Sequence, residues 1–351
     1  MKNDDIVITS AFRTAIGSFN GSLSSKTAPE LGSTVIKKCV ENSCLKREEV
    51  DMVYMGQVLT AGVGQNPARQ STIFAGLPNE TTNTTVNQVC GSGLASVALA
   101  YNSIKCGDGK LVIAGGQESM SNSPHYMNIR KGIKMGDGKM KDSMIIDGLW
   151  DVYNQYHMGI TAENVAEKFQ IRREEQDSFA AASQRKAAEA IKEKKFVNEI
   201  VPVKIKFKKE EIEFDKDEYP KAESTVEKLA KLRPAFKKDG TITAANASSI
   251  SDGASALVLT SSAYAQQKNL QPLARIVAHA THAQLPAEFT LAPIGAIKKV
   301  LEKAGWNSVE VDLFEINEAF AVVSLLAIQE LGLDENKVNV NGGACALGHP
   351  I

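Results

Sequence analysis

Two stretches of the chain, residues 31–58 and residues 294–319, are similar to each other. Each predicts a helix with glycine at its second position, then a short polar turn, a Val-Asp pair and a strand. A second similarity follows in the same order, because Val-Asn ends a predicted strand before a Gly/Cys segment at 86–87 and again at 340–341. Two matches in one order predict a duplicated α/β unit, and this constrains the fold more than any other feature.

The pattern of apolar residues agrees with that prediction in the first third of the chain. Strands alternating with helices indicate βαβ units and a sheet covered on both faces. The predicted strands lie at 6–12, 50–59, 84–89 and 110–116, and the predicted helices lie at 31–43 and 93–107.

The region after residue 120 differs in composition and in the spacing of its apolar residues. We interpret it as an insertion into the first half. It begins with a Gly-, Met- and Lys-rich excursion, continues as two helices over 161–196 broken near Ile171, and becomes highly charged. The core pattern returns with a strand at 251–261. The predicted domains are 1–120 plus 250–272 for the N-terminal half, 121–249 for the insertion, and 273–351 for the C-terminal half.

Charge and cysteine content narrow the function class. Lys plus Arg number 40 and Asp plus Glu number 41, a balance that argues against nucleic-acid and polybasic membrane binding. The N-terminus has no signal or transit pattern, and no apolar run is long enough to span a membrane. Five cysteines without a CxxC pair favour reduced thiols in the cytoplasm, and no Cys/His cluster has the spacing of metal ligands.

Cys90 is the first candidate for chemistry, since NQVCGSG places it between a predicted strand and a predicted helix. A helix N-terminus favours the thiolate, which is the nucleophilic form of cysteine. Gly91 and Gly93 permit a tight turn and close approach of a substrate. The alternative is a small structural cysteine at the end of a strand.

Two further candidates lie in the C-terminal half. His349 stands in NGGACALGHP, where a strand ends in glycines and a loop presents the histidine before Pro350. Asn317 stands in EINEAFA, at the end of the repeated strand and before an apolar helix. Each also has an ordinary structural explanation, a loop histidine in one case and a helix cap in the other.

Together, NQVCGSG, EINEAFA and NGGACALGHP resemble the motifs of the thiolase family. The blocks GQNPARQ, GGQESMSNSP, YHMGITAENVAEK and KLRPAFKKDGTITAANAS add to the resemblance, which runs from residue 6 to the last residue. The GQNPARQ and YHMG blocks look most like the acetyl-CoA acetyltransferase branch. The resemblance implies an α/β fold, a five-layered α-β-α-β-α thiolase core made of two similar halves, with an inserted loop domain.

The resemblance also assigns roles. Cys90 would attack the acetyl thioester and carry the acetyl group, and its backbone N–H would contribute to an oxyanion hole for the tetrahedral intermediate. His349 would activate the thiol and donate a hydrogen bond to a thioester oxygen. Asn317 would orient a water that completes this second oxyanion hole.

The loop domain would hold coenzyme A as part of the substrate, with no permanently bound cofactor or metal. By the family's pattern, Ala319 and Phe320 close the pocket behind the acyl group, and Lys221 stands near the CoA phosphate where relatives often carry Arg. Lys228 and Ala245 depart from the family pattern in the same region. The residues expected along the pantetheine and adenine path are Leu149, His157, Met158, Phe236, Ala244 and Ser248.

The activity implied is the reversible condensation of two acetyl-CoA to acetoacetyl-CoA and CoA through an acetyl-cysteine. The alternatives are a degradative 3-ketoacyl-CoA thiolase, a ketosynthase, and a CoA-ester-binding fragment without turnover. The last arises because family members carry a second catalytic cysteine in a CxG motif beyond the GHP segment, whereas this sequence ends at Ile351. The sequence is therefore expected to be a fragment that is inactive in condensation. The resemblance further implies a homodimer or homotetramer, with residues 125–145 as a tetramer contact.

Overall fold

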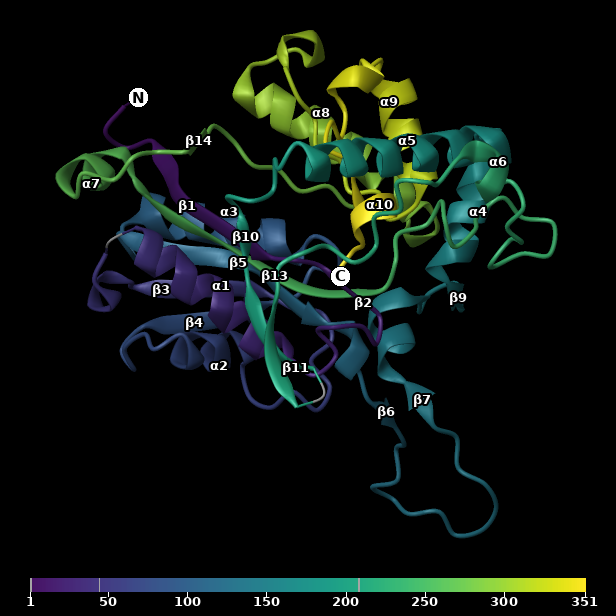
Figure 1. Cartoon of the computed structure of the whole chain (residues 1–351), viewed down its shortest axis with the longest axis horizontal. Coiled ribbons are helices and arrows are strands. Elements are labelled where there is room, and N and C mark those ends of the chain that lie inside the picture. Colours follow the sequence, from purple (N-terminus) through teal and green to yellow (C-terminus); the bar gives the residue numbers. More distant parts are fainter. Residues whose placement is uncertain (1, 44, 208) are drawn as a thin grey trace.

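The computed structural model describes residues 2–43, 45–207 and 209–351, which leaves Cys44 outside the described residues. Its centre is an eight-stranded mixed sheet with the order β10-β1-β13-β5-β3-β4, while β14 also pairs with β1 and β2 with β13 (Figure 1). The strands of this sheet are β1 (Ile6–Thr14), β2 (Gly17–Ser18), β3 (Met52–Gly56), β4 (Thr82–Val86), β5 (Leu111–Ser119), β10 (Ile200–Val201), β13 (Ser251–Ser261) and β14 (Ala274–Ile276).

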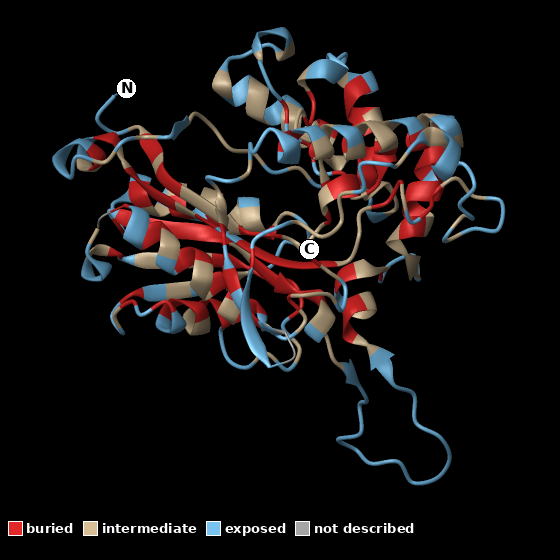
Figure 2. Ribbon diagram, viewed as in Figure 1, coloured by how far each residue is buried: buried red, intermediate tan, exposed pale blue. Residues whose placement is uncertain are grey.

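Helices cover both faces of this sheet, as the alternating pattern predicts. Helices α1 (Ala28–Asn42) and α2 (Pro67–Phe74) pack on one face, and α3 (Ser92–Cys106) packs on the other. Strand β5 shows the alternation clearly, because Leu111 and Ile113 join the α1 core while Val112 and Ala114 join the α3 core. Figure 2 shows the central strands buried along most of their length.

The long-range pairing of β13 joins the two ends of the first half. Strand β13 runs antiparallel to β1 along one edge and antiparallel to β5 along the other. Strand β3 is parallel to both β5 and β4, in agreement with the predicted βαβ units. Strand β13 follows the insertion and β5 precedes it, so their pairing brings the two ends of the insertion close together.

The two repeated helices begin earlier than predicted, so Gly32 is the fifth residue of α1 and Gly295 the fourth of α8 (Ala292–Ala304). Each glycine allows a close approach. A Cβ on Gly32 would lie 1.9 Å from Oε1 of the buried Gln117, and a Cβ on Gly295 would lie 2.4 Å from the ring of His282. The repeat therefore preserves a packing requirement as well as a pattern of elements.

The insertion contains the two predicted helices and several short hairpins. Helix α4 (Met158–Lys168) and helix α5 (Arg173–Lys192) flank Ile171, where the sequence predicts a break. The other elements are β6 (His125–Tyr126), β7 (Lys141–Asp142), a π-helical turn (Ile145–Leu149), β8 (Trp150–Asp151), β9 (Tyr156–His157), β11 (Val203–Phe207), β12 (Glu210–Phe214) and α6 (Val226–Leu229).

The C-terminal half is largely helical in the described residues. It contains α8 (Ala292–Ala304), α9 (Ala321–Leu331) and α10 (Ala344–Leu347), and α7 (Ser262–Gln267) precedes it. It also contains short 3-10 turns at Pro286–Leu291, Ser308–Glu310 and Glu335–Lys337. Two further 3-10 turns lie earlier in the chain, at Arg47–Glu49 and Met120–Asn122.

The repeated strand predicted before residue 319 is reduced to one parallel bridge between Phe314 and Val338. Beyond this bridge, the Asn339 side chain takes the place of the backbone hydrogen bonds that a neighbouring strand would make. Asn339 Oδ1 accepts a hydrogen bond from the Ile316 N–H, and Asn339 Nδ2 donates one to the Ile316 carbonyl, each at 2.8 Å. The backbone polar groups of Ile316 are thus satisfied without a strand.

Two strands outside the predicted N-terminal half pair with β1 of that half. Strand β14 lies in the range assigned to the C-terminal half but pairs with β1 of the first sheet. Strand β10 comes from the insertion and pairs with the other end of β1. Across the described ranges, no helix combines the length and the apolarity needed to cross a membrane.

Replacing Gly32 tests the close approach of α1 to the sheet. Gly32→Ala gains up to about 1 kcal/mol of helix propensity but overpacks a buried site, which costs about 1–3 kcal/mol. We expect a net loss of about 1 kcal/mol or more in the free energy of unfolding by urea. Lys37→Ala, on the exposed side of the same helix, is the control. Unchanged unfolding of Gly32→Ala would contradict the packing described.

Candidate active site

Cys90 lies in the turn between β4 and α3, as predicted. The preceding residue, Val89, has a φ of +49°, a conformation that is costly for a β-branched side chain and marks a constrained turn. The Cys90 thiol is reachable by solvent, yet desolvation by the surrounding protein raises its pKa to about 11. The expectation that the helix N-terminus favours the thiolate is therefore wrong for the resting structure, because desolvation is the larger effect.

His349 lies at the end of the chain segment that follows α10. Its backbone N–H donates to the Ser249 carbonyl and to Ser251 Oγ, and the residue forms a parallel bridge with Ile250. Desolvation lowers the pKa of His349 to about 4, so the imidazole is neutral at pH 7. A neutral imidazole can accept a proton, which is the property that a general base needs.

Asn317 and His349 are brought into contact although 32 residues separate them. The Asn317 Nδ2 and His349 Nε2 atoms lie 3.3 Å apart. An amide nitrogen only donates, so Nε2 accepts in this arrangement and Nδ1 carries the ring proton. Asn317 is exposed and is not the cap of the following helix α9, whose N-cap residue is Phe320.

One apolar cluster lies beneath the Cys90 turn and the His349 segment. Val58, Leu59, Met120, Met144 and Ile351 form its buried part. Three partly buried residues pack against it, namely Val89, which precedes Cys90, Ile250, which is bridged to His349, and the predicted CoA-path residue Leu149. The catalytic candidates from the two halves are therefore attached to the same support.

Aromatic residues from three segments stack beside the start of α4. The His157 ring lies 4.7 Å from the Phe236 ring, and Phe236 meets Phe320 edge to face at 6.3 Å. His157 Nδ1 accepts the Gly159 N–H, and desolvation lowers the His157 pKa. Met158 packs against the core that contains Phe320. The predicted CoA-binding residues His157, Met158, Phe236 and Phe320 thus come together.

The 244–248 segment runs beside the Asn317 loop. The Ser248 N–H donates to the Ala319 carbonyl at 3.0 Å, and Ala247 forms an antiparallel bridge with Phe320. Ala244 is exposed on the same segment. Lys221 is exposed, and its backbone N–H donates to the Gln184 side chain of α5.

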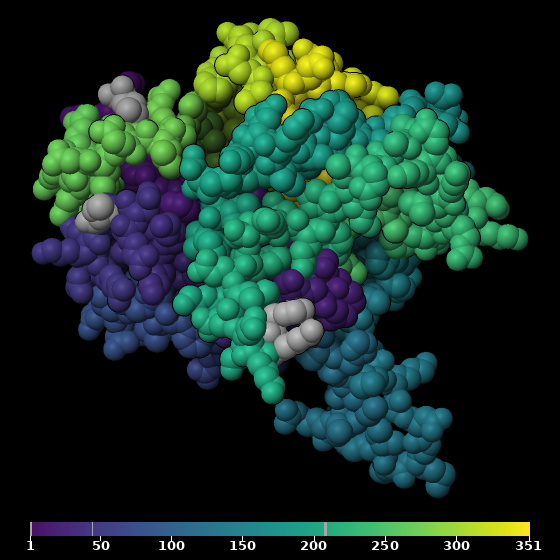
Figure 3. All heavy atoms as spheres, viewed as in Figure 1, coloured from purple at the N-terminus to yellow at the C-terminus, as the bar shows by residue number. Residues whose placement is uncertain are grey.

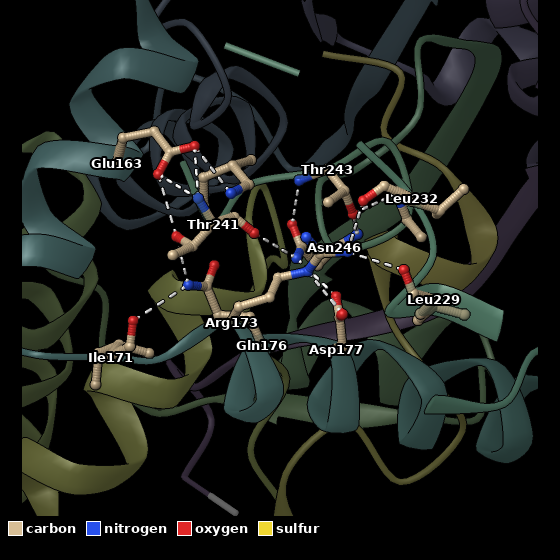
Figure 4. Close-up of polar contacts among 12 residues, drawn as sticks. Glu163, Ile171, Arg173, Gln176, Asp177, Leu229, Leu232, Thr241, Thr243 and Asn246 are labelled. Atoms are coloured by element: carbon tan, nitrogen blue, oxygen red, sulfur yellow. Dashed lines mark hydrogen bonds and ion pairs between the residues drawn. The ribbon is translucent and has the colours of Figure 1, made fainter. Parts of the chain in front are cut away.

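A buried polar network holds the 241–248 segment in place (Figure 4). Asn246 Nδ2 donates to Asp177 at 2.9 Å, and Asp177 pairs with Arg173. The Glu163 carboxylate accepts backbone N–H groups of Thr241 and Ile242. The signal available in the sequence was the TITAANAS block itself, but only the fold shows which helices supply its partners.

Glu118 is a second buried group that sequence reasoning did not identify. Its Oε2 atom accepts the Val58 N–H at 2.8 Å and the Leu59 N–H at 3.3 Å, which ties the 57–59 loop to β5. Desolvation raises the pKa of Glu118 to about 8, and nearby Asp252 acts in the same direction. This carboxyl group therefore supports the apolar cluster while largely protonated at neutral pH.

No group of three or more His, Cys, Asp or Glu side chains within the described residues is arranged to hold a metal ion. The four described cysteines are free thiols, with Cys39 and Cys345 buried and Cys90 and Cys106 exposed. Of these, Cys90 follows Val89, which packs against the same apolar cluster as Ile250, the bridge partner of His349.

Comparisons with known proteins match the whole chain. Residues 6–263 match the model for the thiolase N-terminal domain, and residues 270–351 match the model for the thiolase C-terminal domain. An acetyl-CoA acetyltransferase of Pseudomonas aeruginosa is 54% identical over 349 residues, and that of Chromobacterium violaceum is 55% identical over 349 residues. Each alignment covers 99% of this chain and 89% of the relative.

The crystal structure of the Bacillus anthracis acetyl-CoA acetyltransferase superposes with a TM-score of 0.97 at 42% identity, and the match covers 100% of this chain and 89% of that one. The predicted thiolase-like duplicated α/β fold is confirmed by this similarity. The matches, which cover 99% of this chain and 89% of the relatives, do not support the prediction of a fragment that is inactive in condensation.

The raised pKa of Glu118 makes stability depend on pH. Between the ordinary value of 4.5 and about 8, the unfolded chain loses this proton while the folded protein keeps it, so unfolding becomes easier as pH rises. Glu118→Gln removes this titration, and its Tm relative to wild type should increase between pH 5 and pH 8. Thermal unfolding measures the difference, with the exposed Glu80→Gln as control. A Tm difference that stays constant across this range would contradict the assignment.

Proposed function

The chain belongs to the thiolase family, and on that premise we propose that it is an acetyl-CoA C-acetyltransferase. The reaction is the reversible condensation of two acetyl-CoA to acetoacetyl-CoA and free CoA. The observation that carries the proposal is the contact of Asn317 with His349 beside the cluster that also supports the Cys90 turn. Relatives named for this activity are 51–55% identical to the chain over almost all its length.

The first half-reaction begins from a neutral thiol and a neutral imidazole. The Cys90 proton passes to His349 as Sγ attacks the thioester carbonyl, forming a C–S bond and a tetrahedral oxyanion. The backbone N–H of Cys90 helps to stabilise that oxyanion. When the intermediate collapses, the bond to the CoA sulfur breaks and the leaving thiolate takes the proton from His349. The products are acetyl-Cys90 and CoA.

The raised pKa of Cys90 and the lowered pKa of His349 are compatible with this sequence. Desolvation disfavours each isolated charge, so the thiol stays protonated until a substrate is in place. Proton transfer, with the two side chains brought together as the resemblance implies, then creates opposite charges on Cys90 and His349. These charges stabilise each other in a site of low polarity. The acetyl group consequently reacts with a thiolate that forms only when the substrate is bound.

In the second half-reaction a second acetyl-CoA loses an α-proton to a base. The resemblance assigns this role to the CxG cysteine that follows the GHP segment in family members, and residues 1–351 do not include that motif. Negative charge then develops on its thioester oxygen. Asn317 Nδ2 can donate to this enolate oxygen directly or through an ordered water. His349 can donate from Nε2 only once that nitrogen carries the ring proton, unlike in the resting arrangement. The carbanion attacks the acetyl carbonyl, a C–C bond forms, and the C–S bond to Cys90 breaks. The Cys90 thiolate then regains the proton that the base removed.

Coenzyme A is a substrate here, with no permanently bound cofactor. The stacked His157, Phe236 and Phe320 offer an apolar path for the pantetheine arm, and Leu149, Ala244, Ser248 and Ala319 extend it by the family's pattern. Lys221 supplies a positive charge for the CoA phosphate. His157 and Met158 narrow the acyl end, which favours the acetyl group over longer chains.

We further propose that the protein is a homodimer or homotetramer in the cytoplasm, as the resemblance and the cysteine pattern imply. The β6–β7 hairpin stands away from the body of the molecule (Figure 3). It also exposes several large apolar side chains. These exposed residues are Tyr126, Met127, Ile129, Ile133, Met135 and Met140. Such a projection is typical of a surface that another copy covers.

Acetylation of Cys90 tests the proposed function. Incubation with acetyl-CoA should add one acetyl group, which peptide mass spectrometry places on Cys90. Cys90→Ala should abolish the label, whereas Cys106→Ala, which removes the exposed thiol at the other end of α3, should retain it. Thiolysis of acetoacetyl-CoA should be faster than thiolysis of a long-chain 3-ketoacyl-CoA.

A label that persists in Cys90→Ala would overturn the choice of nucleophile. Faster thiolysis of the long-chain substrate would instead favour the degradative 3-ketoacyl-CoA thiolase.

Sedimentation equilibrium tests the proposed assembly. The wild-type chain should have twice or four times the mass of the monomer, and replacing Met135 and Met140 by serine should reduce a tetramer to a dimer. A chain that sediments as a monomer at all concentrations would refute the assembly.

A further inference from the structure

We propose that Glu318 is a positioning residue that holds Asn317 against His349, a role that rests on the proposed thiolase activity. Glu318 follows Asn317 directly in the chain, but the two side chains have opposite environments. Asn317 is exposed in the site, whereas Glu318 is fully buried beneath it. A buried carboxyl group next to a proposed catalytic amide needs a structural or functional reason, because its burial is costly.

The backbone on the other side of Asn317 is fixed first. The Asn339 side chain accepts from the Ile316 N–H and donates to the Ile316 carbonyl, as described above. The same Asn339 Nδ2 also donates to Glu318 Oε1 at 2.8 Å. One buried asparagine thus holds the residues on both sides of Asn317.

The Glu318 carboxylate binds two further segments through Oε2. Ser183 Oγ of helix α5 donates to it at 2.8 Å, and the backbone N–H of Cys345 in α10 donates at 2.9 Å. The carboxylate therefore receives three hydrogen bonds from three separate parts of the chain. Charge-assisted hydrogen bonds of this kind are among the stronger ones in proteins.

Additional contacts tighten the connection to the segment that carries His349. The Gly343 N–H donates to Ser183 Oγ at 3.0 Å, and the Cys345 thiol donates to the Glu318 carbonyl at 3.7 Å. A Cβ on Gly343 would lie 2.4 Å from the Glu318 carboxyl carbon, so backbone and carboxylate are packed directly together. The absence of a side chain at Gly343 therefore leaves room for the Glu318 carboxylate.

His349 follows α10 by two residues and is anchored at its own backbone by Ser249 and Ser251. Glu318 fixes the start of that segment, and it fixes the backbone of Asn317 as well. The 3.3 Å separation of Asn317 Nδ2 and His349 Nε2 therefore depends on both anchors. A shift of about 1 Å in such a pair can lower a rate by roughly 100-fold.

The three partners favour an ionised carboxylate, although desolvation raises the pKa of Glu318. A backbone N–H can only donate, and the amide nitrogen of Asn339 can only donate. In Glu318→Gln, an amide nitrogen would face one of these donors, which breaks a hydrogen bond without changing the shape of the side chain. The substitution thus loosens one anchor while leaving the packing volume intact.

Kinetics of Glu318→Gln test the proposal. We expect kcat for acetoacetyl-CoA thiolysis to fall about 10- to 100-fold, with KM within about twofold of wild type. Glu318→Asp should recover part of the rate, because it restores the charge. Glu330→Gln, the same change at an exposed position on α9, should match wild type. A kcat of Glu318→Gln within twofold of wild type would overturn the proposal.

A double-mutant comparison separates positioning from a general structural effect. If Glu318 acts through Asn317, adding Glu318→Gln to Asn317→Ala should lower kcat by less than about twofold further. Effects that multiply in the double variant would show that Glu318 acts independently. Should Glu318→Gln fail to fold, Ser183→Ala removes one donor and should lower kcat in the same direction by a smaller factor. An unchanged kcat in Ser183→Ala would then count against the proposal.

Hydrogen–deuterium exchange of the substrate-free protein tests the anchor without any activity. Exchange in peptides spanning 314–320 and 340–349 should be faster in Glu318→Gln than in wild type and Glu330→Gln. Equal exchange would overturn the inference even if the enzyme is a thiolase. Wild type that forms no acetyl-Cys90 would overturn the proposed function, while the exchange result would still decide whether Glu318 anchors the two loops.

Discussion

The stretch from Thr241 to Ser261 is the constraint on which the other parts of the structure depend. Its first residues are fixed by the buried Asp177 and Glu163 of the insertion. Its middle bonds to Ala319 and bridges His349, and its last eleven residues form β13 between β1 and β5. The insertion, the C-terminal half and the sheet are thus registered against one continuous backbone, so their relative positions are not independent.

In the site, two of the polar groups proposed to react are exposed, whereas the polar groups that hold them in place are buried. Cys90 and Asn317 are exposed and make few contacts of their own, whereas Glu318 and Asn246 are buried and hydrogen-bonded to several segments. Buried polar groups of this kind are stable only when their partners are present. Precise placement of the reacting groups is therefore a property of the supporting network, and substitutions far from the substrate can reduce the rate.

Sequence patterns predicted local structure and motif chemistry well, and tertiary relationships poorly. The break near Ile171 and the 251–261 strand follow from apolar spacing, which is a local property. The lone bridge at Phe314 could not be predicted, since it depends on the Asn339 side chain taking the place of a strand. The protonated resting state of Cys90 was missed because desolvation depends on packing, whereas the helix N-terminus is visible in the motif. The partners of Glu318 lie on α5 and α10, and no spacing rule connects them.

The position of β13 between β1 and β5 also affects how the chain folds during its synthesis on the ribosome. Strands β1 and β5 are complete once residue 119 is made, yet the strand that joins them ends at residue 261. At about 5–20 residues per second, roughly 7 to 28 seconds of translation separate the two events. During that interval the nascent chain carries two long apolar strands without their shared neighbour, and unpaired strand edges are prone to aggregation. Chaperone demand should therefore be concentrated in this window of synthesis and should end when β13 emerges.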